Sequence, residues 1–259
     1  MHVTATTLSG ETRDSFCDAG RMTEVTDLGT VVAVWAHPDD ETYLAGGLFA
    51  ALTDAGRRVV CVTATRGEAG GPVGSEVALA RLRTDELNAA LDVLGVAEHH
   101  WLDHPDGGCA EVDAGTAAGR VAAVVADVRP DTVITFGPDG FTGHPDHCAV
   151  SAWTDLALRR ANAKPRLLHA VAREEVVDPA LDEDFGVFEL GRPRVCANDD
   201  MALLLHLDGE LLDRKVAALQ RQMSQTGVLI DAVGPARYRA WVATEAFAEP
   251  EHTEVRDGR

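Results

Sequence analysis

The sequence is poor in basic residues. Its 23 Lys and Arg stand against 42 Asp and Glu, which gives a formal net charge of −19. Nucleic-acid binding depends on clusters of Lys and Arg that release counterions from phosphates, so this balance argues against a nucleic-acid partner. The sequence also has no apolar run near the roughly 20 residues that span a bilayer, and no signal-peptide pattern at its start. We therefore expect neither a nucleic acid nor a membrane as partner, and a cytoplasmic location.

Paired cysteines are missing as well. The five cysteines are scattered and none belongs to a C-x-x-C pair, which argues against a disulfide framework and against a thiolate zinc site. Isolated thiols fit a reducing cytoplasm. The 46% hydrophobic and 25% charged residues are typical of a globular protein.

The length of 259 residues fits one large α/β domain. Residues 1–28 show no periodicity and are predicted to form a loosely ordered N-terminal arm. We expect a single domain over residues 29–250, followed by a C-terminal tail at residues 251–259. The sequence does not indicate the oligomeric state.

Short apolar runs alternate with helical patterns along most of the chain. The apolar runs are typical of strands that are buried on both faces, and they fall at Thr30–Ala36, Arg58–Ala64, His99–Leu102, Asp131–Phe136 and Arg166–Ala172. The helical patterns fall at Leu44–Ala55, Val77–Leu94, Ala117–Val128 and Pro145–Arg160. This alternation predicts a Rossmann-like, three-layer α/β/α fold with a mostly parallel sheet.

The alternation weakens beyond residue 173. One amphipathic helix is predicted at Gly209–Gln225, followed by an apolar stretch at Tyr238–Phe247. We expect this less regular C-terminal portion to pack on the sheet and to form one wall of the site. The first predicted strand is followed by HPDDETYLAGG rather than by the glycine fingerprint of dinucleotide binders, which argues against a nucleotide cofactor.

Two nearly identical tetrapeptides follow two of the predicted strands. They are HPDD at residues 37–40 and HPDH at residues 144–147. Proline suits the first position of a helix, and residues three apart on a helix share one face. Because the carboxyl ends of parallel strands form the sites of such folds, both clusters are expected to meet there.

His37, Asp40 and His147 would provide two imidazoles and one carboxylate for a divalent metal, with positions left open for water and substrate. The same set suits zinc and Fe(II), so the metal stays open at this point. Asp39 and His144 would then remain as acid–base groups beside the metal.

A simpler interpretation is that each His-Pro-Asp marks a capped helix start. We expect residues 104–106, which form a third His-Pro-Asp in a glycine-rich loop, to be such a case, because no partner ligand is visible there. Two matched clusters at corresponding strand ends favour the metal site for the other pair.

These residues resemble the PIG-L/LmbE family of metal-dependent N-deacetylases. The family motifs AHPDDE and HPDH match residues 36–41 and 144–147, T-x-G-E matches residues 65–68, and R-x-x-E-L matches Arg83, Glu86 and Leu87. The resemblance covers roughly residues 30–250. Bacterial members act on N-acetylglucosamine conjugates, and they include a deacetylase and a conjugate amidase of mycothiol metabolism.

The resemblance implies roles for particular residues. The implied zinc ligands are His37, Asp40 and His147. Asp39 would be the general base, and His144 would stabilise the oxyanion or protonate the leaving amine. The implied supporting residues are Asp146, which would orient His144, Arg83, which would contact substrate, and Glu68, which would form part of the wall.

Two departures concern the substrate pocket. Thr142 stands where some relatives have Tyr, and Gln222 stands where many have His. The sequence thus predicts a zinc hydrolase that removes an acyl group, with acetyl as the first expectation, from the nitrogen of an amino-sugar-like small molecule. The alternatives are a conjugate amidase that cleaves a larger amide and a metal-binding module without catalysis.

Overall fold

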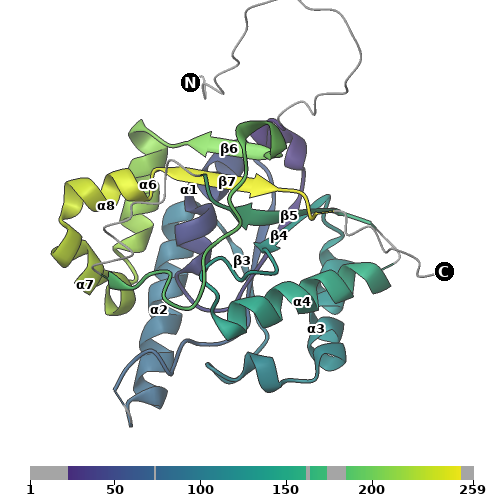
Figure 1. Ribbon diagram of the computed structural model, residues 1–259, viewed down its shortest axis with the longest axis horizontal. Helices are drawn as coiled ribbons and strands as arrows, with labels where there is room; N and C mark the ends of the chain where they lie inside the picture. Colours follow the sequence, from purple (N-terminus) through teal and green to yellow (C-terminus); the bar gives the residue numbers. More distant parts are fainter. Residues whose placement is uncertain (1–22, 73, 162–163, 174–184, 252–259) are drawn as a thin grey trace, which may run out of the picture.

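The computed structural model describes residues 23–72, 74–161, 164–173 and 185–251 (Figure 1). Most of the predicted N-terminal arm and nearly all of the predicted tail at residues 251–259 lie outside the described residues. Within the arm, Val25–Leu28 form a short 3-10 helix, and Leu28 is fully buried. The domain limits themselves stay predictions.

A seven-stranded sheet forms the middle layer, with the order β3-β2-β1-β4-β5-β7-β6. Its strands are β1 (Val31–Trp35), β2 (Val59–Thr63), β3 (Glu98–Trp101), β4 (Thr132–Phe136), β5 (Arg166–Val171), β6 (Leu203–His206) and β7 (Thr244–Ala248). The pairs among β1 to β5 are parallel, whereas β7 runs antiparallel to both β5 and β6. The predicted mostly parallel sheet is confirmed, and the antiparallel edge is an addition from the C-terminal portion.

Helices cover both faces of the sheet (Figure 1). They are α1 (Asp40–Asp54), α2 (Glu76–Leu94), α3 (Ala114–Val128), α4 (Pro145–Arg160), α6 (Gly209–Leu219), α7 (Met223–Val233) and α8 (Pro235–Trp241). Helix α1 packs against α2 and α6, and α3 packs against α4. This is the three-layer α/β/α arrangement that the sequence predicts.

The central strands are buried because their side chains are apolar on both faces. Every residue of β1, β2 and β4 is buried. Between the ends of β1 and β4, Trp35 and Phe136 meet edge to face with ring centroids 5.0 Å apart. This contact ties together the two strands from which the HPDD and HPDH segments leave the sheet.

The strand order reverses direction between β1 and β4. From β1 the chain proceeds to β2 and β3 on one side, whereas β4 is followed by β5 on the other. Ligands of open α/β sheets bind in the crevice at such a switch point, outside the carboxyl ends of the strands. The fold therefore places both clusters at the position where this kind of sheet forms a site.

The predicted single helix at Gly209–Gln225 is wrong, because the structure has two helices there. Helix α6 ends at Leu219, and α7 begins at Met223. Between them, the side chain of Gln222 turns inward, where its Nε2 donates to Glu41 Oε1 at 2.7 Å and to Thr42 Oγ1 at 2.9 Å. These buried hydrogen bonds to α1 hold Gln222 between the two helices, where the sequence pattern favours one continuous helix.

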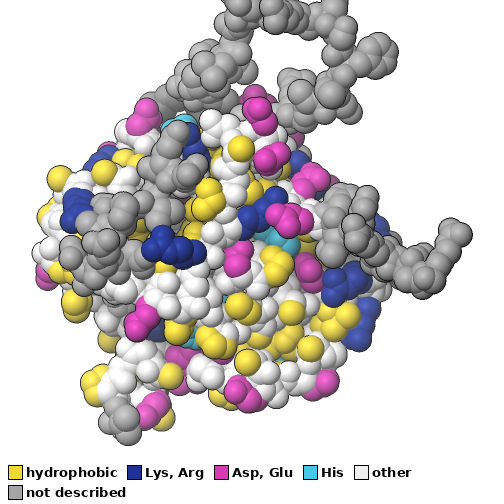
Figure 2. All heavy atoms as spheres, viewed as in Figure 1, with side chains coloured by type: hydrophobic (Ala, Val, Ile, Leu, Met, Phe, Trp, Pro, Cys, Tyr) yellow, Lys and Arg dark blue, Asp and Glu magenta, His cyan; other side chains and the backbone are white. Residues whose placement is uncertain are grey.

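The C-terminal portion extends the sheet as well as covering it. The apolar stretch Tyr238–Phe247 contains the end of α8 and most of β7. On the face shown in Figure 2, basic side chains lie in separate spots among acidic and hydrophobic ones. None of the described helices combines the length and apolarity needed to cross a bilayer.

Candidate metal and catalytic centre

The turn from β1 into α1 holds Asp39 in an unusual backbone conformation. Its φ is 102°, a region that costs a non-glycine residue on the order of 1–3 kcal/mol. Its side chain makes no capping hydrogen bond to α1, although it occupies the N-cap position. The capping interpretation therefore does not account for Asp39.

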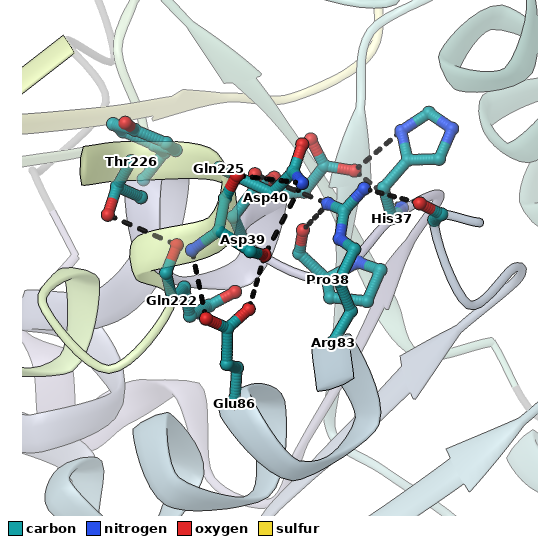
Figure 3. Close-up of polar contacts among 12 residues, drawn as sticks. His37, Pro38, Asp39, Asp40, Arg83, Glu86, Gln222, Gln225 and Thr226 are labelled. Atoms are coloured by element: carbon teal, nitrogen blue, oxygen red, sulfur yellow. Dashed lines mark hydrogen bonds and ion pairs between the residues drawn. The ribbon is translucent and has the colours of Figure 1, made fainter. Parts of the chain in front are cut away.

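Two buried side chains hold this turn in place. Glu41 is fully buried, and its Oε2 accepts the N–H of Asp39 at 3.0 Å. Arg83 reaches from α2 and donates to the carbonyls of Pro38 at 2.5 Å and Gly67 at 2.8 Å (Figure 3). Its Nη2 also lies 3.4 Å from Asp39 Oδ2. Only 4% of the surface of Arg83 is exposed, so Arg83 is a buried residue that supports the site rather than a surface arginine.

Burial and a nearby charge shift the pKa of the Asp39 carboxyl group in opposite directions. Burial raises its pKa to about 8, against the attraction of the Arg83 guanidinium, which lowers it. A general base must be ionised before it can accept a proton, so the nearby Arg83 guanidinium, which favours the charged form, supports this use of the Asp39 carboxylate.

The start of α4 is capped by His144. Its Nδ1 accepts the N–H of Asp146 at 3.2 Å, and Pro145 takes the first helical position. A neutral His144 therefore carries its proton on Nε2. The ring centroid of His144 lies 4.9 Å from that of His37 and 5.0 Å from that of His147. The two clusters that the sequence places at separate strand ends thus meet.

His37, Asp40 and His147 turn polar atoms toward one another. His37 Nδ1 lies 3.1 Å from His147 Nε2, Asp40 Oδ1 lies 3.4 Å from His147 Nε2, and Asp40 Oδ2 lies 3.7 Å from His37 Nδ1. Ligands held tetrahedrally at the usual zinc distances of roughly 2.0–2.1 Å lie about 3.4 Å apart. The spacing of the three groups therefore fits one metal ion.

The other nitrogen of each ring is held by hydrogen bonds. His147 Nδ1 lies 2.9 Å from the carbonyl oxygen of Gly140. His37 Nε2 lies 3.0 Å from Asp106 Oδ1 and 3.3 Å from Asp146 Oδ2. Metal-binding histidines usually donate their outer N–H to a carbonyl or carboxylate, which directs the remaining lone pair at the metal. Both rings have this arrangement.

Negative charge surrounds His37. Burial lowers its pKa, but Asp106, Asp146 and Asp40 together outweigh burial and raise it to about 10. In turn, Asp146 has its pKa lowered to about 2, because the contact with His37 and two loop amides outweigh its burial. The His37 ring is thus fixed by ionised carboxylates on its outer edge.

Asp106 is the residue that sequence reasoning missed. We expected residues 104–106 to form a capped turn without a partner, but Asp106 contacts His37, which lies at the end of another strand. The available signal was the His-Pro-Asp tripeptide itself, which follows β3 as the two motif copies follow β1 and β4.

Asp146 also lies differently from its implied role. Its carboxylate contacts His37 and accepts the N–H groups of Gly107 at 2.8 Å and Cys109 at 3.0 Å. Only its backbone N–H reaches the His144 ring. The contacts therefore favour a role for Asp146 in orienting His37.

Glu68 lies at the edge of this centre. Its Oε1 accepts the N–H of Asp106 at 3.1 Å, and its buried Oε2 has no hydrogen-bond partner among the described residues. Glu68 also lines a hollow together with Arg66 and Asp103.

Two overlapping groups of side chains in the described part of the chain could hold a metal ion. One contains His37, His144 and His147, and the other contains His37, Asp106 and Asp146; Asp40 is in neither group, although its carboxylate oxygens lie 3.4 Å from His147 Nε2 and 3.7 Å from His37 Nδ1. Imidazoles and carboxylates are ligands of zinc and Fe(II), and a partly buried site with a nearby acid–base group is typical of catalysis. The fold and the site together define an α/β protein with a candidate metal centre at its topological switch point.

Comparisons with known proteins agree with this class. The family model described as PIG-L, GlcNAc-PI de-N-acetylase, matches residues 32–158. A relative from Corynebacterium glutamicum, named 1D-myo-inositol 2-acetamido-2-deoxy-alpha-D-glucopyranoside deacetylase, is 31% identical over 252 residues, which cover 87% of this chain and 83% of the relative. The chain belongs to the PIG-L family.

Two further comparisons differ in how much they cover. A protein of the same name from Kineococcus radiotolerans is 38% identical over 159 residues, but the match spans 49% of this chain and 44% of that relative. The solved structure of the A40926 pseudoaglycone deacetylase superposes with a TM-score of 0.62 over 86% of this chain and 97% of that chain, at 20% identity. This second likeness supports the fold.

Proposed function

We propose that the chain hydrolyses the amide bond between an acyl group and the nitrogen of an amino-sugar-like small molecule. The observation that carries the proposal is the arrangement of His37, Asp40 and His147 around one point, with the strained Asp39 beside them. The deacetylase names of the relatives, which mention an acetamido sugar, support the choice of substrate class.

His37, Asp40 and His147 would hold one divalent metal. Zinc is the first expectation, and the ligand set also suits Fe(II). When bound, such a metal supplies Lewis acidity toward the amide carbonyl and lowers the pKa of a water molecule. Asp106 and Asp146 would orient His37 through its outer nitrogen.

Asp39 would accept the proton of the attacking water. The carboxylate is available for this because it does not cap α1, and Arg83 and Glu41 hold the turn that presents it. As the water oxygen bonds to the acyl carbon, the carbon–nitrogen bond breaks, and the products are a carboxylate and an amine. His144 would donate a hydrogen bond from Nε2 to the oxyanion, and the proton that Asp39 takes from the water would pass to the leaving amine; His144 could give the amine its proton instead only as the imidazolium.

Arg83 and Glu68 would have different roles in the site. The contacts of Arg83 support a positioning role for Asp39, and any contact with substrate would come from the same guanidinium. Glu68, which lines the hollow beside Asp106, would form part of the wall for a hydroxylated substrate.

The same residues bear on the two alternative functions, a conjugate amidase and a metal-binding module without catalysis. A conjugate amidase would use the same chemistry on a larger amide, so substrate tests must include such compounds. A metal-binding module without catalysis gives no reason for a strained Asp39 whose carboxylate caps nothing. We expect a cytoplasmic location, which four free cysteines in the described part of the chain support.

Release of free amine tests the proposal. The zinc-loaded chain is incubated with N-acetylated amino sugars and with cysteinyl conjugates of larger size. Asp39→Asn should lower kcat by about 10²–10⁴-fold, because the amide cannot accept the water proton. Asp92→Asn, at an exposed position on α2, is the matched control and should retain the wild-type rate.

Two outcomes would contradict the proposal at different levels. No amine release from any amide by the wild type would refute the function. Normal turnover by Asp39→Asn would refute the role of Asp39 while leaving the hydrolase function in place.

A further inference from the structure

A cavity of about 270 Å³ opens directly beside Asp40 and His147. Most of its wall is apolar, and the side chains that contribute include Leu44, Phe136, Phe141, Val171, Leu229 and Trp241. The floor comes from β4, β5 and β7, and α1, α7 and α8 form the sides. Two of the proposed metal ligands thus form one end of an otherwise mostly apolar chamber.

Two of the polar side chains in this wall, Glu245 and Tyr43, already make hydrogen bonds. Glu245 pairs with Lys215 at 2.8 Å and accepts the N–H groups of Gly47 and Leu48 at 2.7 and 2.8 Å. The Tyr43 hydroxyl accepts from the Tyr238 hydroxyl at 2.8 Å. Sugar hydroxyls placed here would lose hydrogen bonds to water and gain few in return, which disfavours their binding. The cavity therefore suits an apolar group.

A second hollow, of about 400 Å³, is lined by both charged and apolar side chains. Arg66, Glu68, Glu76 and Asp103 are among its lining residues. Glu68 lines this hollow and accepts the N–H of Asp106, whose carboxylate contacts His37 Nε2. The apolar cavity is lined by His147, whose Nε2 lies 3.1 Å from His37 Nδ1. The centre thus adjoins a hollow that contains charged side chains on one side and a mostly apolar cavity on the other.

We propose that the apolar cavity binds the acyl chain of the substrate, and that this chain is longer than acetyl, with about six to eight carbons. This inference rests on the proposed function. If each non-hydrogen atom takes about the 30 Å³ that a water molecule occupies in the liquid, the cavity holds about nine such atoms. The single methyl of an acetyl group would leave most of this apolar space unfilled. Hydrolysis then releases a medium-chain carboxylate and the free amino sugar.

Relative rates on matched substrates test the chain length. The zinc-loaded chain is assayed for kcat/KM with N-acetyl-, N-butanoyl- and N-octanoyl-glucosamine, and with the octyl glycoside of N-acetylglucosamine. Each buried methylene favours binding by about fourfold. We expect N-octanoyl-glucosamine to exceed N-acetylglucosamine by at least tenfold, and the octyl glycoside to gain no such advantage.

Two variants locate the effect in the cavity. Leu229→Glu puts a charge into the wall, and Val228→Glu puts the same charge on the next residue, which is 79% exposed. Leu229→Glu should reduce the octanoyl-to-acetyl ratio at least tenfold, whereas Val228→Glu should preserve it. Phe188→Glu, in a loop segment of the wall, gives the same test outside any helix if Leu229→Glu fails to fold.

A binding measurement separates this inference from the proposed function. Octanoate and acetate are titrated calorimetrically into the zinc-loaded chain. Both carry a carboxylate, so a difference in affinity reports the apolar chain. Octanoate should bind at least tenfold more tightly, and Leu229→Glu should remove the difference.

If N-acetylglucosamine is hydrolysed as fast as N-octanoyl-glucosamine or faster, the inference is overturned and the proposed function stays intact. A preference for the octyl glycoside would overturn it by assigning the cavity to the sugar side. If no amide is hydrolysed, the proposed function fails; tighter octanoate binding would then still support an apolar-chain site, and equal binding of both acids would refute it.

Discussion

Replacement of Lys215 by methionine should destabilise the fold strongly. Lys215 and Glu245 are both fully buried, and their charged atoms lie 2.8 Å apart between α6 and β7. Lys215 Nζ also donates to the carbonyl of Tyr43 in α1 at 2.7 Å. This ion pair thus joins the C-terminal portion to the helix that carries Asp40.

The expected size follows from what the variant leaves behind. Removal of one partner of a buried ion pair typically costs about 3–5 kcal/mol, because the other charge stays buried. Glu245 would keep the N–H groups of Gly47 and Leu48, so we expect a loss near the lower end, about 3 kcal/mol. For a chain of this size the melting temperature should fall by roughly 6–12 °C.

Urea unfolding followed by circular dichroism measures the effect. Lys164→Met, the exposed lysine replacement, should change stability little. The double variant Lys215→Met/Glu245→Gln should recover part of the loss, because it no longer buries an unpaired charge. A loss under about 1 kcal/mol for Lys215→Met, or a double variant as unstable as the sum of the singles, would refute this reasoning.

Three other predictions concern packing, metal and cofactor. Gly47→Ala should destabilise the fold by about 1–3 kcal/mol in thermal unfolding, because the new Cβ would lie 2.3 Å from Leu207 Cδ1; Gly119→Ala, with nothing within 4 Å, should be neutral or stabilising. Asp40→Asn should lower metal content and activity together, and added zinc should restore part of both, as elemental analysis and amine release would show. Full metal content in that variant would exclude Asp40 as a ligand. NAD and nucleoside phosphates should show no micromolar affinity in calorimetric titration, because the turn after β1 carries carboxylates where phosphate binders carry glycine.

The sequence predicts the parallel part of the fold well. Strands that are buried on both faces read as continuous apolar runs, so Thr30–Ala36 anticipates β1 and Asp131–Phe136 anticipates β4 to within a residue or two. The helix at Pro145–Arg160 is predicted at its observed bounds, because proline marks its start. Local pattern is sufficient where a segment's own residues decide its structure.

The remainder depends on contacts between distant segments. The break after Leu219 reflects the buried hydrogen bonds of Gln222 to α1, which no local pattern shows. Asp106 gains its role from His37, 69 residues earlier in the sequence, and Arg83 is buried because it reaches back to Pro38. The spacing within each motif and the position of both motifs at strand ends predicted that His37, Asp40 and His147 lie together, but not which groups hydrogen-bond to the outer nitrogens of the two rings.

Metal content is the most direct test of the central claim that His37, Asp40 and His147 form one metal site. The purified wild type should contain about one transition metal per chain by elemental analysis. His147→Ala should lose most of it, whereas His144→Ala and the exposed-residue control His100→Ala should keep it. Equal metal content in His147→Ala and His100→Ala would contradict the account.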